Sequence, residues 1–308
     1  MTLRRTNSYE AFGLSVVSEI PLPELASGDG SSQDDPDVIV RRGSVQNNGG
    51  ENGAVSVTPE GDYRLTYEVA SVLIRDGREI IVDSLDRAHG EIVRHVVVGP
   101  AFNHLLHQRG FFVLHASAVE IGDGAVVFAG TSGQGKTTTA TAFLAAGHRI
   151  LSDDVAAIER VDDPTIRSGF PSIKLEPATV ERFGLSVDPP ENIYEARDRH
   201  FYGLCHKQPV EAVPLRRIYL LEDAQREEIA PAPASEQVLE LIENTYTVSL
   251  HQESDYAREN FTRAVSLAES VPVKRLRRRR RLDVFSDVIA LVENDLGVRG
   301  ERNLGERP

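Results

Sequence analysis

The hydrophobic pattern changes character about one third of the way along the chain. Before residue 100, apolar positions occur in short runs between turn-rich stretches, at 12–17, 38–41, 63–67, 72–74 and 79–82, which predicts strands. Residues 27–35 and 46–53 are too polar to pack and predict loops. We expect a small, mainly β, antiparallel accessory unit, which either caps an edge of the main domain or binds substrate.

After residue 100 the pattern alternates between strands and helices. Residues 91–98 form another run rich in apolar residues, and Pro100 is placed to start a helix with Phe102, Leu105 and Leu106 on one face. Further strands are expected at 111–121, 124–129, 148–151, 155–161, 215–221 and 271–276, and residues 168–175 are expected to form a Gly and Pro turn leading into a short strand. Further helices are expected at 138–146, 177–183, 236–244, 255–268 and 283–296, with a surface loop or lid at 187–209.

Turn residues suggest how these strands are joined. Gly122, Asp123 and Gly124 predict a hairpin between 111–121 and 124–129, and 155–161 is expected to form a hairpin with 148–151. The pattern indicates an α/β protein with an accessory domain at residues 1–99, a main domain at 100–298 and a flexible tail at 299–308.

Composition narrows the class of protein. The net charge is -13, from 47 acidic and 34 basic residues, which argues against nucleic acid as the main ligand and against anionic membranes. The arginine run 277–281 is therefore expected to be a solvated linker or a local patch that pairs with acidic groups. No apolar run approaches the ~20 residues of a membrane span, and Cys205 is the single cysteine, so we expect a cytoplasmic protein.

A glycine-rich stretch carries the strongest chemical signal. It matches the phosphate-binding pattern G-x-x-x-x-G-K-S/T, between the predicted strand 124–129 and the predicted helix 138–146. Its backbone N–H groups would surround phosphate oxygens, Lys136 would add charge, and Thr137 would offer its hydroxyl to Mg²⁺. The expected nucleotide-binding residues are Gly130, Thr131, Ser132, Gly133, Gln134, Gly135, Lys136, Thr137 and Thr138.

An acidic pair follows the predicted strand 148–151. Phosphoryl transfer needs a carboxylate to hold Mg²⁺ and a group to orient or deprotonate the acceptor, and Asp153 and Asp154 can divide those tasks. Lys174 is a candidate for phosphate neutralisation. Further residues suggest anion contact within the predicted lid: Arg197, Arg199, His200 and Lys207.

The order of these motifs resembles the kinase domain of the HPr kinase/phosphorylase family. The resemblance rests on four segments, 114–119 with His115, 130–137, 151–154 and 169–175. It implies a P-loop fold related to phosphoenolpyruvate carboxykinase, with a mixed sheet. It also implies catalytic roles for Lys136, for Asp153 as the group that activates the acceptor, and for His115 near the phosphates, with Mg²⁺ held by Thr137 and Asp154.

The sequence also departs from that family. HPr kinases carry Lys-Ser-Glu where this chain has Lys136, Thr137 and Thr138, and their Glu-Ile-Arg-Gly-Leu-Gly signature has no counterpart. These departures favour an HPr-kinase-related subgroup over a true HPr kinase. Family members often form ring-like oligomers, so the resemblance is compatible with a homo-oligomer.

The function expected from these features is phosphotransfer. We expect an ATP-dependent, Mg²⁺-requiring kinase that phosphorylates a hydroxyl, most readily serine or threonine of a small protein or peptide. Two other hypotheses stay open at this point: a nucleotide-binding regulatory or assembly protein without transfer, and a small-molecule kinase.

Overall fold

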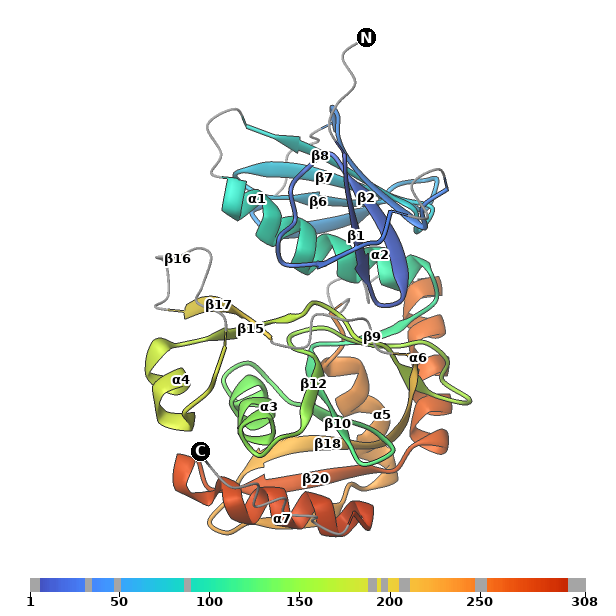
Figure 1. Ribbon diagram of the computed structural model, residues 1–308. Coiled ribbons are helices and arrows are strands. Elements are labelled where there is room, and N and C mark those ends of the chain that lie inside the picture. Colours follow the sequence, from blue (N-terminus) through green and yellow to red (C-terminus); the bar gives the residue numbers. More distant parts are fainter. Residues whose placement is uncertain are drawn as a thin grey trace.

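The computed structural model describes residues 6–30, 35–46, 51–85, 90–187, 193–194, 199–204, 211–246 and 254–298. Their architecture is mixed α/β, with an N-terminal sheet on one side and a larger central sheet on the other (Figure 1). The expectations for Arg197, Cys205, Lys207 and the tail at 299–308 lie outside the described residues.

The N-terminal sheet has the strand order β3-β1-β2-β4-β8-β7-β6-β5. The expectation of an antiparallel unit is wrong for two pairs, because β2–β4 and β4–β8 are parallel. The strands of each parallel pair are joined by long connections rather than tight turns, which allows the second strand to run in the same direction as the first. The strands are β1 (Asn7–Ala11), β2 (Leu14–Ser18), β3 (Ala26–Ser27), β4 (Val38–Arg42), β5 (Ala54–Val57), β6 (Tyr63–Thr66), β7 (Ala70–Arg75) and β8 (Glu79–Ser84).

A helical segment packs against this sheet. It consists of α1 (Gly90–Val96), the π-helical turn η1 (Val97–Ala101) and α2 (Phe102–Gln108). The helix therefore begins at Gly90 rather than at Pro100, which lies inside η1, where a wider turn accommodates its missing N–H. The predicted boundary between residues 99 and 100 falls within this segment. Its buried side chains share a core with the N-terminal sheet: Val93, Val96, Val97, Ala101, Phe102, Leu105 and Leu106.

The central sheet is mixed. The predicted hairpin of β10 and β11 is confirmed, and β18 lies parallel to both β11 and β20. Its path runs β12-β10-β11-β18-β14-β13-β9, with β20 pairing β18 and β19. The strands are β9 (Phe112–Leu114), β10 (Ala116–Ile121), β11 (Gly124–Ala129), β12 (Arg149–Ser152), β13 (Ala156–Ile158), β14 (Thr165–Ile166), β18 (Val213–Asp223), β19 (Glu228–Pro231) and β20 (Val273–Arg278).

Helices cover both faces of the central sheet. Alternate residues of β11 point to opposite faces, so Phe128 packs in the core under α3 (Lys136–Ala145) and α7 (Phe285–Leu296). Val127 packs in the core under α5 (Ala234–Glu243) and α6 (Ser254–Ser270). These helices confirm the sequence predictions to within a few residues.

A small sheet flanks α3, and two of its strands, β16 and β17, lie where a loop or lid was expected. It contains β15 (Ser172–Leu175), β16 (Ile193–Tyr194) and β17 (Arg199–Gly203), in the order β15-β17-β16. β15 was predicted, as was the following helix α4 (Pro177–Phe183), whereas β16 and β17 were not. β17 gains its hydrogen bonds from β15, a long-range pairing that local patterns do not reveal.

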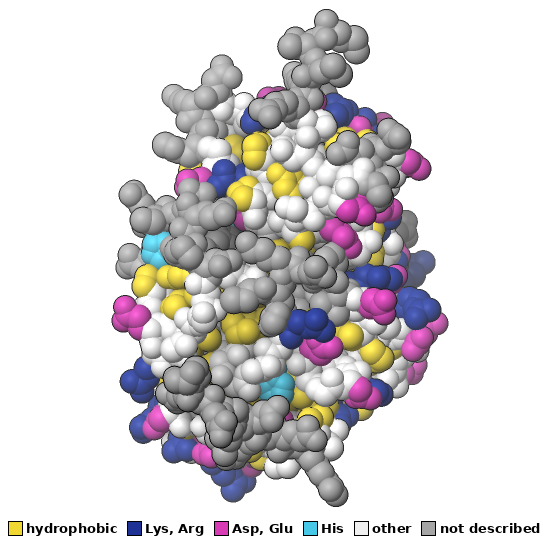
Figure 2. Space-filling view, in the orientation of Figure 1, with side chains coloured by type: hydrophobic (Ala, Val, Ile, Leu, Met, Phe, Trp, Pro, Cys, Tyr) yellow, Lys and Arg dark blue, Asp and Glu magenta, His cyan; other side chains and the backbone are white. Residues whose placement is uncertain are grey.

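The N-terminal sheet and the central sheet share an apolar junction. Phe170, just before β15, makes edge-to-face contacts with Phe12, 5.1 Å between centroids, and with Phe102, at 5.6 Å. On the face of the molecule shown in Figure 2, acidic and basic side chains are interspersed. None of the described helices is both long enough and apolar enough to span a membrane.

Candidate active site

The site forms where two neighbouring strand runs are interrupted. β9 and β10 form one run broken at His115, and β12 and β13 form another broken at residues 153–155. The runs lie antiparallel, with β10 beside β12 and β9 beside β13. The predicted continuous strand 111–121 and the hairpin of 148–151 with 155–161 are therefore wrong. At the second break Asp154 has a left-handed φ of 70°, which interrupts regular pairing.

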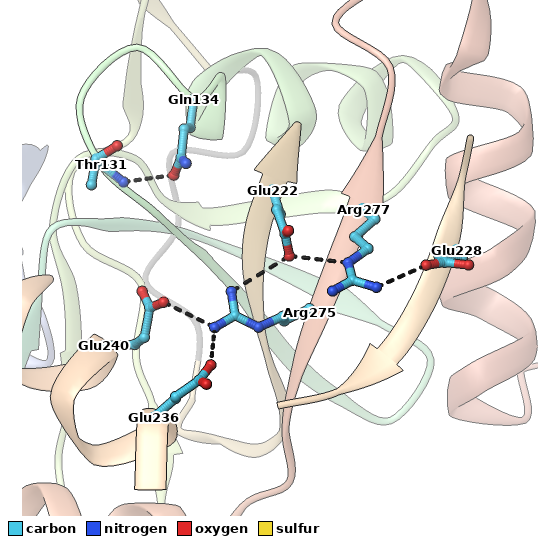
Figure 3. Close-up of polar contacts among 8 residues, drawn as sticks. All are labelled: Thr131, Gln134, Glu222, Glu228, Glu236, Glu240, Arg275 and Arg277. Atoms are coloured by element: carbon cyan, nitrogen blue, oxygen red, sulfur yellow. Dashed lines mark hydrogen bonds and ion pairs between the residues drawn. The ribbon is translucent and has the colours of Figure 1, made fainter. Parts of the chain in front are cut away.

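A glycine loop, residues 130–137, connects β11 to α3 in the predicted order. Gly133 and Gly135 adopt positive φ values of 86° and 79°, and Gly135 is the N-cap of α3. The N–H of Thr131 donates to Oε1 of Gln134 at 2.7 Å and fixes the loop internally (Figure 3). The N-terminus of α3 and its positive dipole end therefore lie at the loop.

Lys136 crosses the base of this loop. Its Nζ donates to the carbonyl oxygen of Gly130 at 2.7 Å, and the residue is buried. Burial lowers the pKa of Lys136, an effect that the charges of Asp154 and Asp153 oppose. With its Nζ donating to the carbonyl oxygens of Gly130 and Thr131, this cation is placed to attract phosphate at the loop.

Asp153 is the buried member of the acidic pair, with 8% of its surface exposed. Its Oδ1 accepts hydrogen bonds from Ser117 Oγ at 2.6 Å and Thr137 Oγ1 at 3.0 Å. Burial, followed by the charge of Asp154, raises the pKa of Asp153 to about 6. The structure thus brings the loop threonine and the first aspartate into direct contact.

Asp154 is the exposed member, with 56% of its side chain accessible. Its Oδ1 lies 3.0 Å from Nδ1 of His115, which in turn lies 2.8 Å from the hydroxyl of Tyr246. Desolvation would raise the pKa of Asp154, but hydrogen bonding and charge from His115, together with Tyr246 and Lys136, lower it. Tyr246 follows α5 and was not singled out from the sequence.

The arginine run divides between two faces because strand side chains alternate. Arg275 and Arg277 on β20 bind glutamates of β18, β19 and α5 (Figure 3). Arg279 binds Glu227 at 2.8 Å. This face confirms the expected pairing with acidic groups.

The other face of the run contradicts the expectation of a solvated linker. Arg278 is 4% exposed and donates from Nη2 to the carbonyl oxygen of Gln134 at 2.6 Å. Arg280 donates to the carbonyl oxygen of Gly133 at 2.5 Å. Arg278 and Arg280 therefore support the glycine loop. The sequence signal for this contact was the alternation of strand side chains: if the predicted strand 271–276 is extended, every second arginine points to the loop.

A larger and a smaller cavity meet at the acidic pair. The larger, about 380 Å³, is lined by the glycine loop, His115, Arg278, Arg280 and Asp154. The smaller, about 70 Å³, lies between the α1–η1 segment and both aspartates. Asp154 lines both cavities.

The remaining basic candidates lie away from the glycine loop. Lys174 lines the smaller cavity, and its main-chain N–H bonds to Asp153. His200 lies on β17 and lines neither of these cavities, and of Arg199 only the strand position is described.

The residues present fit a magnesium nucleotide. The backbone at Gly133 and Gly135 has the left-handed conformation that favours glycine, beside a cavity with Lys136 at its floor. Thr137 and the aspartates offer the oxygen ligands that Mg²⁺ prefers, while the described residues contain no cluster of three or more acidic, His or Cys side chains able to hold a metal. This donor set suits Mg²⁺ that shares its coordination with substrate phosphates.

Comparison with known proteins gives distant structural similarity only. No family model and no curated protein sequence matches the chain. Among solved structures, the HPr(Ser) kinase/phosphatase from Coxiella burnetii matches with 11% identity and a TM-score of 0.32. The match covers 60% of this chain and 95% of that chain. At this similarity the relation is distant, and function has to be inferred from the site itself.

Proposed function

We propose that the protein is an HPr-kinase-like P-loop kinase that transfers the γ-phosphate of ATP to a serine or threonine hydroxyl of a small protein or peptide. The observation that carries this proposal is the 3.0 Å contact of Thr137 with Asp153, which joins the glycine loop to the acidic pair. A phosphate cradle and a carboxylate pair are the parts that phosphoryl transfer requires side by side.

The nucleotide side is formed by the glycine loop. Its backbone N–H groups and Lys136 bind the phosphates, while Arg278 and Arg280 hold the loop through the carbonyl groups of Gln134 and Gly133. Thr137 and Asp154 hold Mg²⁺, which when bound neutralises charge that develops on the transferred group. His115 orients the Asp154 carboxylate from a distance of 3.0 Å.

The acceptor side is formed by Asp153. In the reaction the acceptor oxygen forms a bond to the γ-phosphorus, the bond from that phosphorus to the β–γ bridging oxygen breaks, and ADP leaves. The hydroxyl proton passes to the Asp153 carboxylate, which Ser117 holds in place. His115, Lys136 and Asp153 are thus the proposed catalytic residues.

The test uses labelled ATP and a lysate of the source organism. Wild-type protein with Mg²⁺ should label an acceptor, and Asp153→Asn should reduce labelling about 100-fold or more, because base catalysis contributes 10² to 10⁴. Asp162→Asn, a change to an exposed turn, is the matched control and should label like wild type.

Three outcomes would contradict the proposed assignment. Equal labelling by wild type and Asp153→Asn removes the role of Asp153. A Mg-ATP thermal shift that depends on Lys136 but brings no transfer identifies a nucleotide-binding regulator instead, and label confined to small molecules identifies a small-molecule kinase.

A further inference from the structure

We propose that the smaller cavity is the acceptor pocket, that the α1–η1 segment forms its wall, and that it admits a serine- or threonine-sized hydroxyl but no ring. This inference rests on the proposed kinase function and deepens it. It assigns the helical segment packed on the N-terminal sheet a direct part in substrate selection.

The position of the smaller cavity is the first argument. It borders both Asp153 and Asp154, whereas the larger cavity borders Asp154 and the glycine loop. A nucleotide on the loop and a hydroxyl in the smaller cavity therefore approach the acidic pair from different sides. In-line phosphoryl transfer needs the acceptor and leaving oxygens on opposite sides of the phosphorus.

The wall of the cavity has a specific origin in the sequence. Gly99 lies in the π-helical turn that contains Pro100, and a Cβ built on Gly99 would meet no atom within 4 Å. Gly99 also lines the cavity, with Val98 and His95 from the same segment. The absence of a side chain at Gly99 therefore contributes to the open space beside Asp153.

The N-terminal part of the chain contributes to the lining of the cavity. Arg94 of α1 binds Glu24, in the segment between β2 and β3, through an ion pair of 2.9 Å. Both side chains are mostly buried and both line the cavity. The acceptor pocket thus combines one wall from the N-terminal sheet and its helix with the carboxylates of the central sheet.

The size of the cavity selects the acceptor. Its volume is about 70 Å³, about half that of the roughly 150 Å³ cavity known to bind benzene. The pocket therefore favours the few atoms of a serine or threonine side chain over a sugar, nucleoside or tyrosine ring. In the transfer step that hydroxyl oxygen bonds to the γ-phosphorus, its proton passes to Asp153, and ADP leaves.

The experiment compares acceptors and fills the pocket. Degenerate peptides with one fixed Ser, Thr or Tyr, and free glucose, are incubated with labelled Mg-ATP. We expect Ser and Thr peptides to be labelled at least about tenfold more than Tyr peptides or glucose. Gly99→Leu should reduce labelling of the Ser and Thr peptides about 100-fold, because the new side chain occupies the acceptor position.

A second readout separates this inference from the proposed function. Gly99→Leu should keep the Mg-ATP thermal shift of wild type, and the matched control Gly90→Leu, on α1 but outside the smaller cavity, should keep both shift and labelling. Undiminished labelling by Gly99→Leu, or equal labelling of Tyr peptides or glucose, would overturn the acceptor pocket. A wild type that binds Mg-ATP but labels none of these acceptors would overturn the kinase proposal, and the pocket with it.

Discussion

At the scale of single residues, His107 links the stability of the fold to pH. It is 8% exposed on α2, and its Nδ1 lies 2.9 Å from the hydroxyl of Tyr63. Burial, followed by the charges of Arg263 and His104, lowers the pKa of His107 to about 3. The ordinary pKa of histidine, which applies in the unfolded chain, is 6.5. Between pH 6.5 and about 3 the unfolded chain binds the proton more tightly, so the free energy of unfolding falls as the pH drops.

The corresponding prediction concerns His107→Asn. Through His107, each pH unit below 6.5 should lower the free energy of unfolding of the wild type by about 1.4 kcal/mol. Between pH 6.5 and 5, the free energy of unfolding should therefore fall by ~2 kcal/mol more in the wild type than in the variant. Urea unfolding at several pH values measures this difference. Tyr63→Phe, which removes the partner but keeps the imidazole, should retain the wild-type pH dependence. Identical pH profiles for wild type and His107→Asn would contradict the assignment.

At the scale of elements, β20 supports the site through the alternation of its side chains. Arg278 leaves the strand toward the glycine loop, whereas Arg279 next to it leaves toward Glu227. The first contact is buried and charge-assisted, and the second is on the surface. Substitution of Arg278 should therefore weaken nucleotide binding more than substitution of the neighbouring Arg279.

This inequality is testable by two single substitutions. Arg278→Ala should weaken Mg-ATP binding about 10- to 100-fold, because a charge-assisted hydrogen bond to the loop is worth about 1.5–3 kcal/mol. Arg279→Ala should change the Kd by less than about fivefold, as expected for a surface ion pair. Isothermal titration gives both values. Equal effects of the two substitutions would show that Arg278 has no special relation to the loop.

The same elements show what the sequence could predict. The glycine loop with Lys136 and Thr137 was recognised because it is a local motif between a predicted strand and a predicted helix. The acidic pair was recognised because it directly follows a predicted strand. Tyr246 was not recognised, because it lies 131 positions from His115 in the sequence and contacts it only in the folded structure. The interruption at His115 was missed for a related reason, since the strand pairing around it is set by distant partners and not by propensity.

At the scale of the whole molecule, the α1–η1–α2 segment lies between the N-terminal sheet and the aspartates. Its apolar side chains belong to one continuous core with β9, β13 and Phe170. Of the two roles expected for the N-terminal unit, binding substrate is the one that the proposed acceptor pocket requires. The whole chain, rather than the central sheet alone, would then determine which hydroxyl reaches Asp153.

The most direct test of the central claim is the origin of the transferred label. The lysate fraction that contains the acceptor is incubated with wild-type protein and Mg²⁺ in two parallel reactions. One contains ATP labelled at the γ-phosphorus, and the other contains ATP labelled at the α-phosphorus. The account predicts label on the acceptor from γ-labelled ATP alone, lost in Lys136→Ala and in Asp153→Asn. Transfer from α-labelled ATP, or γ-transfer that survives both substitutions, would contradict the account.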